Sequence, residues 1–161
     1  MAPKFDPELV HVVTVRCLGQ RLPAANVLAS KIGPLQLNVK KVCQQICEVT
    51  HDWPCQKITV KLTVQNRQCT AEVIPSASAY IIKALRKSDK PKIEGQRGNL
   101  ALHEIVEIAR KMAHRSMAKT LAGTVKMVLG TAQSVGCLVE NEHPHRIIEK
   151  INDGSIFVPC E

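Results

Sequence analysis

The nine residues KITVKLTVQ at positions 57–65 alternate polar and apolar side chains without interruption. An alternation with a period of two predicts a β-strand that buries one face and exposes the other. Asn66 and Arg67 then form a suitable turn, and residues 68–74 are expected to return as a second strand. This hairpin determines the fold of the N-terminal part of the chain, and the remaining elements can be predicted outward from it.

On the N-terminal side, residues 10–17 are short and β-branched, which predicts a third strand. Residues 19–34 are rich in Ala, Pro and Gly and are expected to form a loop, because they cannot be a regular helix throughout. Asn38 is expected to cap the helix that follows, in which apolar residues recur at helical spacing. These residues are Val39, Val42, Cys43, Ile46 and Cys47.

On the C-terminal side, Pro75 ends the hairpin and Ser76 is expected to cap a helix that runs through residues 80–85. Residues 88–99 are dominated by charged and polar side chains, Pro and Gly, which is typical of a linker. Apolar periodicity predicts three further helices, two long and one short. They are expected at about 102–112, 118–135 and 144–151, with Pro144 at a tolerated first position.

These elements predict an α+β protein. A small α/β N-terminal domain is expected at residues 1–87, a hinge linker at 88–98 and an all-helical C-terminal domain at 99–161. No apolar run reaches the ~18 residues that a membrane span needs, and the first residues show no signal-peptide stretch. No segment combines a Lys-rich helical face with large apolar residues opposite, so no membrane partner is expected.

The formal net charge is +8 and the pI is about 9.3, so a polyanion such as nucleic acid is the expected partner. The alternative is an ordinary protein that happens to be basic. Residues 1–86 hold 11 basic and 5 acidic side chains, whereas residues 87–161 hold 11 and 9. Since only four residues are aromatic, an RNA partner would be recognised by its backbone and folded shape rather than by base stacking.

The helix expected at 118–135 has one apolar side for a core and a second side that is basic and nearly without bulk. The members of this second side are Lys119, Gly123, Lys126, Gly130 and Ser134. A glycine inside a helix costs about 1 kcal/mol relative to alanine, so two glycines on one side suggest that something approaches the backbone closely. An RNA minor groove is one candidate, with Thr131 beside Gly130, and a tightly packed second helix is the other.

Other residues were considered as ligands or catalysts. Arg115, in His114-Arg115-Ser116 before this helix, is a natural phosphate ligand, or otherwise a solvated surface arginine. Cys43 and Cys47, with His51 four residues further on, could hold a metal, but an apolar helical face favours cysteines that pack as small hydrophobes. No nucleotide, protease or hydrolase motif occurs, so no catalytic residue, cofactor or metal is expected.

Several stretches resemble the universal ribosomal stalk-base family, large-subunit protein eleven of bacteria and twelve of eukaryotes. They are KIGPL at 31–35, ITVKLTVQNR at 58–67, PSASA at 75–79, the looser EIVEIAR at 104–110 and, most closely, GTAQSVGC at 130–137. KFDP at 4–7 and HPH at 143–145 look like the eukaryotic branch. The similarity covers the whole chain in order.

The resemblance implies a structural protein of the large subunit of cytosolic ribosomes. Its C-terminal domain would bind the rRNA of the GTPase-associated centre, and its N-terminal domain would face translational GTPases and the acidic stalk proteins. The expected rRNA-binding residues are Arg115, Ser116, Lys119, Gly123, Lys126, Gly130, Thr131, Gln133 and Ser134, and Lys31, Gly33, Pro34 and Leu35 are expected in a loop that faces factors and rRNA. The alternative is a free RNA-binding or regulatory module on the same fold.

The sequence also departs from the pattern of that family. Such proteins usually carry Gly at the positions of Gln20 and Gln36 and Pro at the position of Val39. They usually open the first C-terminal helix with Thr where this chain has Ala101, so Asn99 would have to cap that helix instead.

Overall fold

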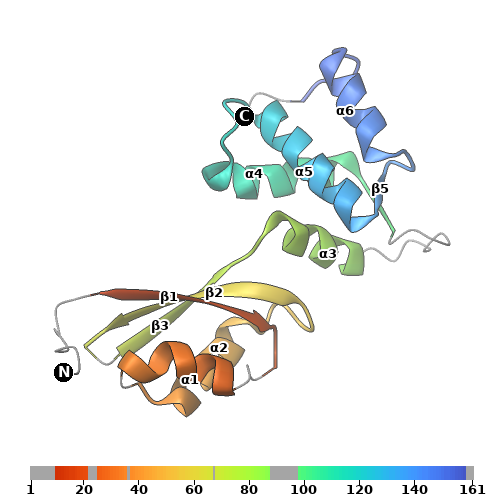
Figure 1. The fold of residues 1–161 in the computed structure, drawn as a ribbon. Coiled ribbons are helices and arrows are strands. Elements are labelled where there is room, and N and C mark those ends of the chain that lie inside the picture. The colour runs from red at the N-terminus through yellow and green to blue at the C-terminus, as the bar shows by residue number, and fades with distance from the viewer. Residues whose placement is uncertain (1–9, 22–24, 36, 67, 88–97, 159–161) are drawn as a thin grey trace. The chain divides into compact units, whose positions relative to one another are not determined.

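The structure is a computed structural model that describes residues 10–21, 25–35, 37–66, 68–87 and 98–158. The chain divides into two compact units, 1–76 and 77–161. The N-terminal unit contains β1 (His11–Leu18), α1 (Ala25–Ile32), the 3₁₀ turn η1 (Gly33–Leu35), α2 (Val39–Val49), β2 (Lys57–Gln65) and β3 (Gln68–Ile74) (Figure 1).

The three strands form an antiparallel sheet in the order β1-β2-β3, as the hairpin pattern predicts. Val60 of β2 pairs with Val15 on one side and with Val73 on the other. The apolar residues of β2 are buried at every second position, and helices α1 and α2 cover that face of the sheet (Figure 1). Asn38 caps α2 as expected, because its side chain accepts a hydrogen bond from Lys40 N at 3.1 Å.

The prediction of a loop at residues 19–34 is wrong for the second half of this range, since α1 and η1 occupy residues 25–35. Leu28 and Ile32 lie four residues apart and are both fully buried, so one turn of apolar spacing was enough to dock this short helix on the sheet. Gly33 and Pro34, which favoured a loop, follow the last residue of α1 and so do not interrupt its hydrogen bonds, and Pro23 lies outside the described residues.

A tight corner follows β1. A Cβ atom on Gly19 would lie 1.8 Å from the main-chain oxygen of Trp53, so no side chain fits there. Gln20 adopts a φ of 59°, a backbone region that glycine occupies more readily than glutamine. Its side-chain amide donates a hydrogen bond to His51 O at 3.0 Å, which helps to stabilise this backbone conformation.

The C-terminal unit contains α3 (Ala77–Lys87), β4 (Asn99–Leu100), α4 (Leu102–Met112), the 3₁₀ turn η2 (Ala113–Arg115), α5 (Leu121–Val135), β5 (Leu138–Val139) and α6 (Pro144–Asn152). The expected α+β class is confirmed, although this unit is not purely helical, because β4 and β5 form a short parallel pair. No helix among the described residues is both long and apolar enough to cross a membrane.

The compact C-terminal unit begins at Ala77, ahead of the boundary expected after residue 87. Ile81 of α3 is fully buried in the same core as Ile105 of α4 and Leu129 of α5. Helix α3 therefore belongs to the helical unit, although it follows the hairpin directly in the sequence. The expected linker at 88–98 lies outside the described residues except for Gly98.

The expectation that Asn99 caps α4 is wrong. Asn99 lies in β4, where its side-chain amide donates to Asn141 Oδ1 at 2.8 Å and its Oδ1 accepts from Asn141 N at 3.0 Å. Helix α4 begins after Ala101, whose main-chain N–H donates to the Glu104 carboxylate at 3.0 Å. A glutamate at the third helical position thus satisfies a main-chain donor at the start of the helix.

Candidate nucleic-acid interface

Helix α5 carries most of the candidate site. Its inner side is fully buried in the core of the C-terminal unit, at residues Val125, Val128, Leu129 and Ala132. Its outer side holds Gly130, Gln133 and Ser134, all exposed. The predicted core side of this helix is therefore present in the structure, and Gly130 lies on an exposed side of the helix.

The two glycines of the outer side have different surroundings. A Cβ atom built on Gly130 would meet nothing within 4 Å, so its backbone is open. A Cβ atom on Gly123 would lie 2.8 Å from the Cβ of Ala118, in the segment that precedes the helix. Gly123 therefore allows this chain to pack on itself, whereas Gly130 leaves room for something outside the chain.

The hydroxyl groups beside Gly130 are held by the helix. Thr131 Oγ1 donates to Met127 O at 3.1 Å, and Ser134 Oγ donates to Thr131 O at 2.8 Å. Each hydroxyl oxygen keeps lone pairs that can accept a hydrogen bond, for example from a ribose 2′-hydroxyl. The two side chains thus present acceptors in fixed positions.

The segment before α5 is anchored to the helix. Thr120 caps α5 by accepting a hydrogen bond from Gly123 N at 3.3 Å. The buried Thr124 hydroxyl donates to Ser116 Oγ at 3.0 Å, and Ser116 Oγ also accepts from Ala118 N at 3.1 Å. Ser116, expected as an RNA ligand, is therefore first a structural residue.

Helix α5 begins at Leu121, three residues later than the sequence predicted. Lys119 is exposed but lies outside the helix, so the regular helical steps that placed it beside Gly123 and Lys126 do not apply. Lys119 still supplies a cation two residues before α5, within the anchored segment that leads into the helix.

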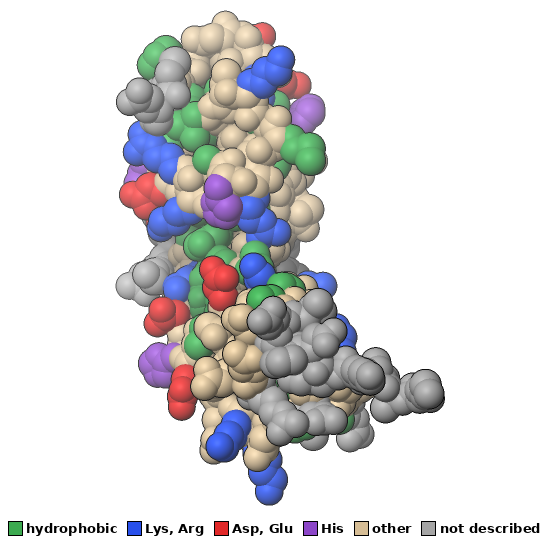
Figure 2. Space-filling model, turned by 90° about the vertical axis from the view of Figure 1, so that its left-hand side faces the viewer, with side chains coloured by type: hydrophobic (Ala, Val, Ile, Leu, Met, Phe, Trp, Pro, Cys, Tyr) green, Lys and Arg blue, Asp and Glu red, His purple; other side chains and the backbone are tan. Residues whose placement is uncertain are grey.

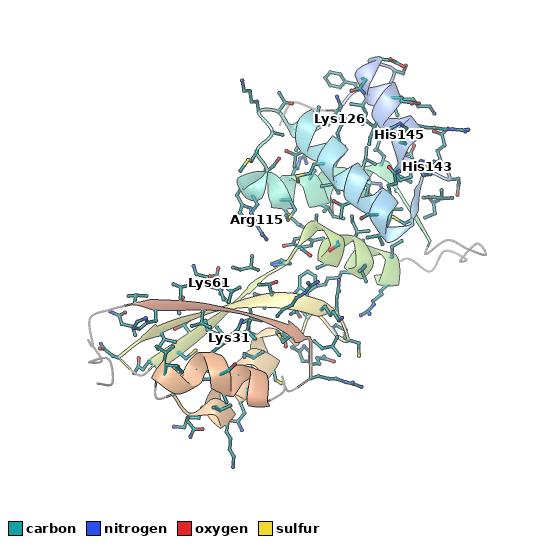
Figure 3. The ribbon with its side chains drawn as sticks, viewed as in Figure 1. Lys31, Lys61, Arg115, Lys126, His143 and His145 are labelled. Carbon is teal, nitrogen blue, oxygen red and sulfur yellow. The ribbon has the colours of Figure 1, made fainter. Side chains whose placement is uncertain are left out.

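The candidate cations are spread over the unit. Lys126 Nζ lies 2.5 Å from Asn152 Oδ1 of α6, and Lys126 takes part in no ion pair with any described residue. Arg115, at the end of η2, lies well apart from Lys126 (Figure 3). On the face shown in Figure 2, lysines and arginines are interspersed with acidic and neutral side chains. This distribution favours recognition of a shape over attraction by a dense basic patch.

Sequence reasoning missed two exposed methionines. Met127 is 41% exposed and stands between Gly123 and Gly130 at helical spacing, so the outer side of α5 is not bare. Met117 is fully exposed in the segment before the helix. The step of four residues from Gly123 identifies Met127 from sequence, but the position of Met117 depends on the irregular segment after η2.

The motif GTAQSVGC at 130–137 divides into two sets of residues. Gly136 ends α5 with a φ of 81°, and its N–H donates to Ala132 O and Gln133 O. Cys137 is buried and Ala132 is fully buried, so both serve the fold. Three other members, Gly130, Gln133 and Ser134, are exposed and remain available to a partner.

The four residues expected in the N-terminal loop also have different surroundings. Lys31 lies in the last turn of α1, and its ammonium donates to Thr14 O of β1 at 2.8 Å (Figure 3). Gly33 and Pro34 of η1 are exposed, whereas Leu35 is only 9% exposed and belongs to the core.

Cys43 and His143, considered as possible ligands or as part of a helix start, both serve the fold. Cys43 is buried on α2. Its pKa is raised, mainly by burial and to a smaller extent by the nearby Cys47 thiol. The described residues contain no group of three His, Cys, Asp or Glu side chains that could hold a metal ion. Helix α6 begins at Pro144 as the sequence predicts, and His143 caps it, since its Nδ1 accepts a hydrogen bond from His145 N at 3.3 Å (Figure 3).

Comparison with known proteins gives matches along both units. The family model for the N-terminal domain of ribosomal protein L11 matches residues 13–69, and the model for its RNA binding domain matches residues 73–139. Large ribosomal subunit protein uL11 of Caenorhabditis elegans is 47% identical over 165 aligned residues, which cover all of both chains. The uL11A protein of Schizosaccharomyces pombe is 48% identical with the same coverage, and uL11 of Candida albicans is 50% identical over 99% of both chains.

The fold and the matches together define a two-domain ribosomal protein with an RNA-binding module. The chain belongs to the ribosomal protein L11 family. This family is a structural component of the ribosome and not a family of enzymes, which confirms both the resemblance and the expectation of a non-enzymatic protein.

Proposed function

We propose that this chain is a structural constituent of the large subunit of cytosolic ribosomes and binds the rRNA of the GTPase-associated centre at the stalk base. The match of residues 73–139 to an RNA binding domain and the names of the relatives support this proposal. The observation that carries it is the open backbone of Gly130 on the outer side of α5. Without a partner in contact with it, a mid-helix glycine is an avoidable cost of about 1 kcal/mol.

Some residues of this interface shape the protein surface, and the others contact the RNA. Ser116 and Gly123 shape the segment that leads into α5, because each is engaged with other residues of this chain. Thr131 and Ser134 offer acceptors, and the open backbone of Gly130 admits a ribose. The remaining members, Arg115, Lys119, Lys126 and Gln133, supply charge and hydrogen-bond donors at phosphates or base edges.

The N-terminal unit faces translational GTPases and the acidic stalk proteins in this proposal. Gly33 and Pro34 are exposed beside the last turn of α1 and can meet a partner directly. Lys31 and Leu35 hold this turn on the N-terminal unit. Lys31 donates a hydrogen bond to Thr14 O, and Leu35 packs in the core.

The proposal is tested by comparing the affinity of the full-length chain for a fragment of the GTPase-associated-centre rRNA with its affinity for a hairpin RNA of equal length. Lys119→Ala should weaken binding and reduce the salt slope by about 1, whereas the matched exposed lysine change Lys111→Ala on α4 should not. Equal affinity for both RNAs would contradict the proposal. Co-sedimentation with large subunits through a high-salt wash separates a subunit constituent from a free regulatory module, which should wash off.

A further inference from the structure

The sheet of the N-terminal unit has an open edge at β3. The strand order makes β3 an outer strand, and Gln65 pairs with Gln68 beside the turn. In an antiparallel ladder that starts from such a pair, alternate residues turn their main-chain N–H and C=O groups away from the neighbouring strand. These residues are Cys69, Ala71 and Val73, and no described residue outside β2 forms a hydrogen bond with β3.

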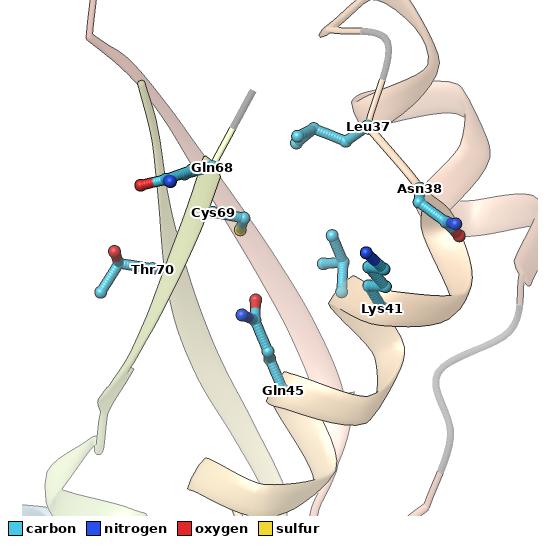
Figure 4. A pocket seen from close by; sticks show the side chains of 8 residues that line it. Leu37, Asn38, Lys41, Gln45, Gln68, Cys69 and Thr70 are labelled. Atoms are coloured by element: carbon cyan, nitrogen blue, oxygen red, sulfur yellow. The ribbon is translucent and has the colours of Figure 1, made fainter. Parts of the chain in front are cut away.

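A groove of about 490 Å³ lies between this edge and α2 (Figure 4). Leu37, Val42 and Cys69 give it apolar walls, so part of an incoming side chain can be removed from water there. A strand added beside β3 would therefore place alternate side chains against α2 while its backbone pairs with the open edge.

The polar part of the groove favours an acidic ligand. Lys41 is exposed. Among the described residues it is the one charged member of the lining, and it forms no ion pair with any of them. Gln45 and Gln68 supply neutral amides that can donate to carboxylate oxygens. Glu48 and Glu72, the acidic residues on the two elements that form the groove, are not part of its lining.

A nucleic acid fits this groove poorly. Single-stranded nucleic acids bind mainly through stacking on aromatic rings and through several cations along the backbone. Among the described residues, the lining contains no aromatic residue and only one lysine. The main-chain groups of β3 suit the evenly spaced amides of an extended peptide instead.

We propose that the groove between α2 and β3 binds an acidic, extended peptide segment, which adds to the sheet as a fourth strand beside β3. This inference rests on the partner role proposed for the N-terminal unit and specifies where an acidic partner binds. It does not depend on rRNA binding by the C-terminal unit.

The test uses the full-length chain and a capped eight-residue peptide of alternating glutamate and valine. Amide hydrogen exchange, read by NMR, should slow on addition of the peptide at Cys69, Ala71 and Val73, while Gln68 and Thr70, paired within the sheet, should change little. Lys41→Glu should weaken peptide binding by about fivefold, the size expected when repulsion replaces one exposed charge pair. Lys40→Glu, the neighbouring lysine outside the lining, is the matched control and should have a much smaller effect.

A peptide with lysine in place of glutamate should show the reverse preference and bind Lys41→Glu better than the wild-type chain. Equal losses from the two charge reversals, or slowed exchange only elsewhere in the chain, would overturn the proposal. So would protection of the β3 edge by a single-stranded oligouridine and not by the peptide. Titration of the same samples with the rRNA fragment tests the peptide-binding proposal separately from the proposed rRNA binding. Normal rRNA binding without peptide binding would contradict only the proposal for the groove.

Discussion

The hydroxyl of Thr124 donates a hydrogen bond to Ser116 Oγ at 3.0 Å and so joins α5 to the segment that precedes it. Thr124 is only 2% exposed, and its other contact, with Thr120 O, is longer at 3.5 Å. The position of this segment, which includes Lys119, therefore depends on a hydrogen bond between the buried Thr124 hydroxyl and the half-buried Ser116 hydroxyl.

Ser116→Ala should lower the stability of the C-terminal unit by about 1 kcal/mol, since it removes the better partner of a buried hydroxyl. Thr124→Val should have a similar effect, and the double variant should lose less than the sum, because both changes remove one interaction. Urea unfolding of the four proteins measures this coupling. If Ser116→Ala weakened rRNA binding at unchanged stability, Ser116 would be a direct RNA ligand rather than an anchor.

Lys126 and Asn152 give a second prediction, about charge. Lys126→Ala should weaken rRNA binding and lower the salt slope by about 1 if its ammonium neutralises one phosphate. Asn152→Ala removes only the neutral partner, so the affinity should stay close to that of the wild type. Lys150→Ala, a lysine engaged with Glu142 at 2.7 Å, is the control for a general loss of charge. Equal slopes for Lys126→Ala and the wild-type chain would exclude a phosphate contact at Lys126.

The burial of Ile81 predicts which fragment folds. A chain of residues 98–161 contains the helical domain that the sequence suggested at 99–161. It lacks α3 and would expose the core where Ile81 packs. We expect residues 77–161 to fold and to bind the rRNA fragment, and residues 98–161 to be unfolded or much less stable. In the full chain, Ile81→Ala should cost about 2–5 kcal/mol. Circular dichroism melts decide this, and a stable, RNA-binding 98–161 fragment would contradict the assignment of α3.

The sequence predicted those parts of the fold that local patterns determine. The alternation of 57–65, the Asn38 cap and the start of α6 at Pro144 are all present. Helix α1 was missed because a single buried pair, Leu28 and Ile32, docks it between helix-breaking residues. The assignment of α3 to the C-terminal unit depends on contacts with residues far along the chain, which local patterns do not encode.

The candidate site was predictable to a similar degree. The helical period gave the outer side of α5, including the exposed Gly130. Spacing could not show that Gly123 packs on Ala118, or that Ser116 bonds to Thr124, because both contacts form where the chain folds back before α5. The sequence pattern predicts a helix that already includes Lys119, whereas α5 begins at Leu121, since helix starts are set by caps such as Thr120.

The cysteines give a prediction about reactivity. Burial raises the pKa of the Cys137 thiol, and a hydrogen bond from the main chain of Cys137 itself offsets this only in part, so little reactive thiolate forms. At mildly alkaline pH, iodoacetamide should modify the exposed Cys55 quickly and Cys137 only after unfolding. Because the folded thiol holds its proton more tightly, its contribution to stability should be present below about pH 8.5 and decline above it. Mass spectrometry of digested protein measures the order, and early modification of Cys137 would contradict its burial.

Gly130 and Gly123 give the sharpest prediction, because the same substitution on one helix should have opposite effects on stability. Gly130→Ala adds a Cβ atom to open space, so it should stabilise the free protein by up to about 1 kcal/mol through helix propensity. Gly123→Ala would place its Cβ 2.8 Å from the Cβ of Ala118, so it should destabilise the start of α5. If Gly130 lies against RNA, Gly130→Ala should nevertheless weaken rRNA binding, and larger residues should weaken it further in order of their size. Thermal melts and rRNA titrations on both variants measure the two quantities separately. A Gly130→Ala protein that is more stable and binds rRNA with wild-type affinity would remove Gly130 from the interface, and with it the observation on which the RNA-facing assignment of α5 depends.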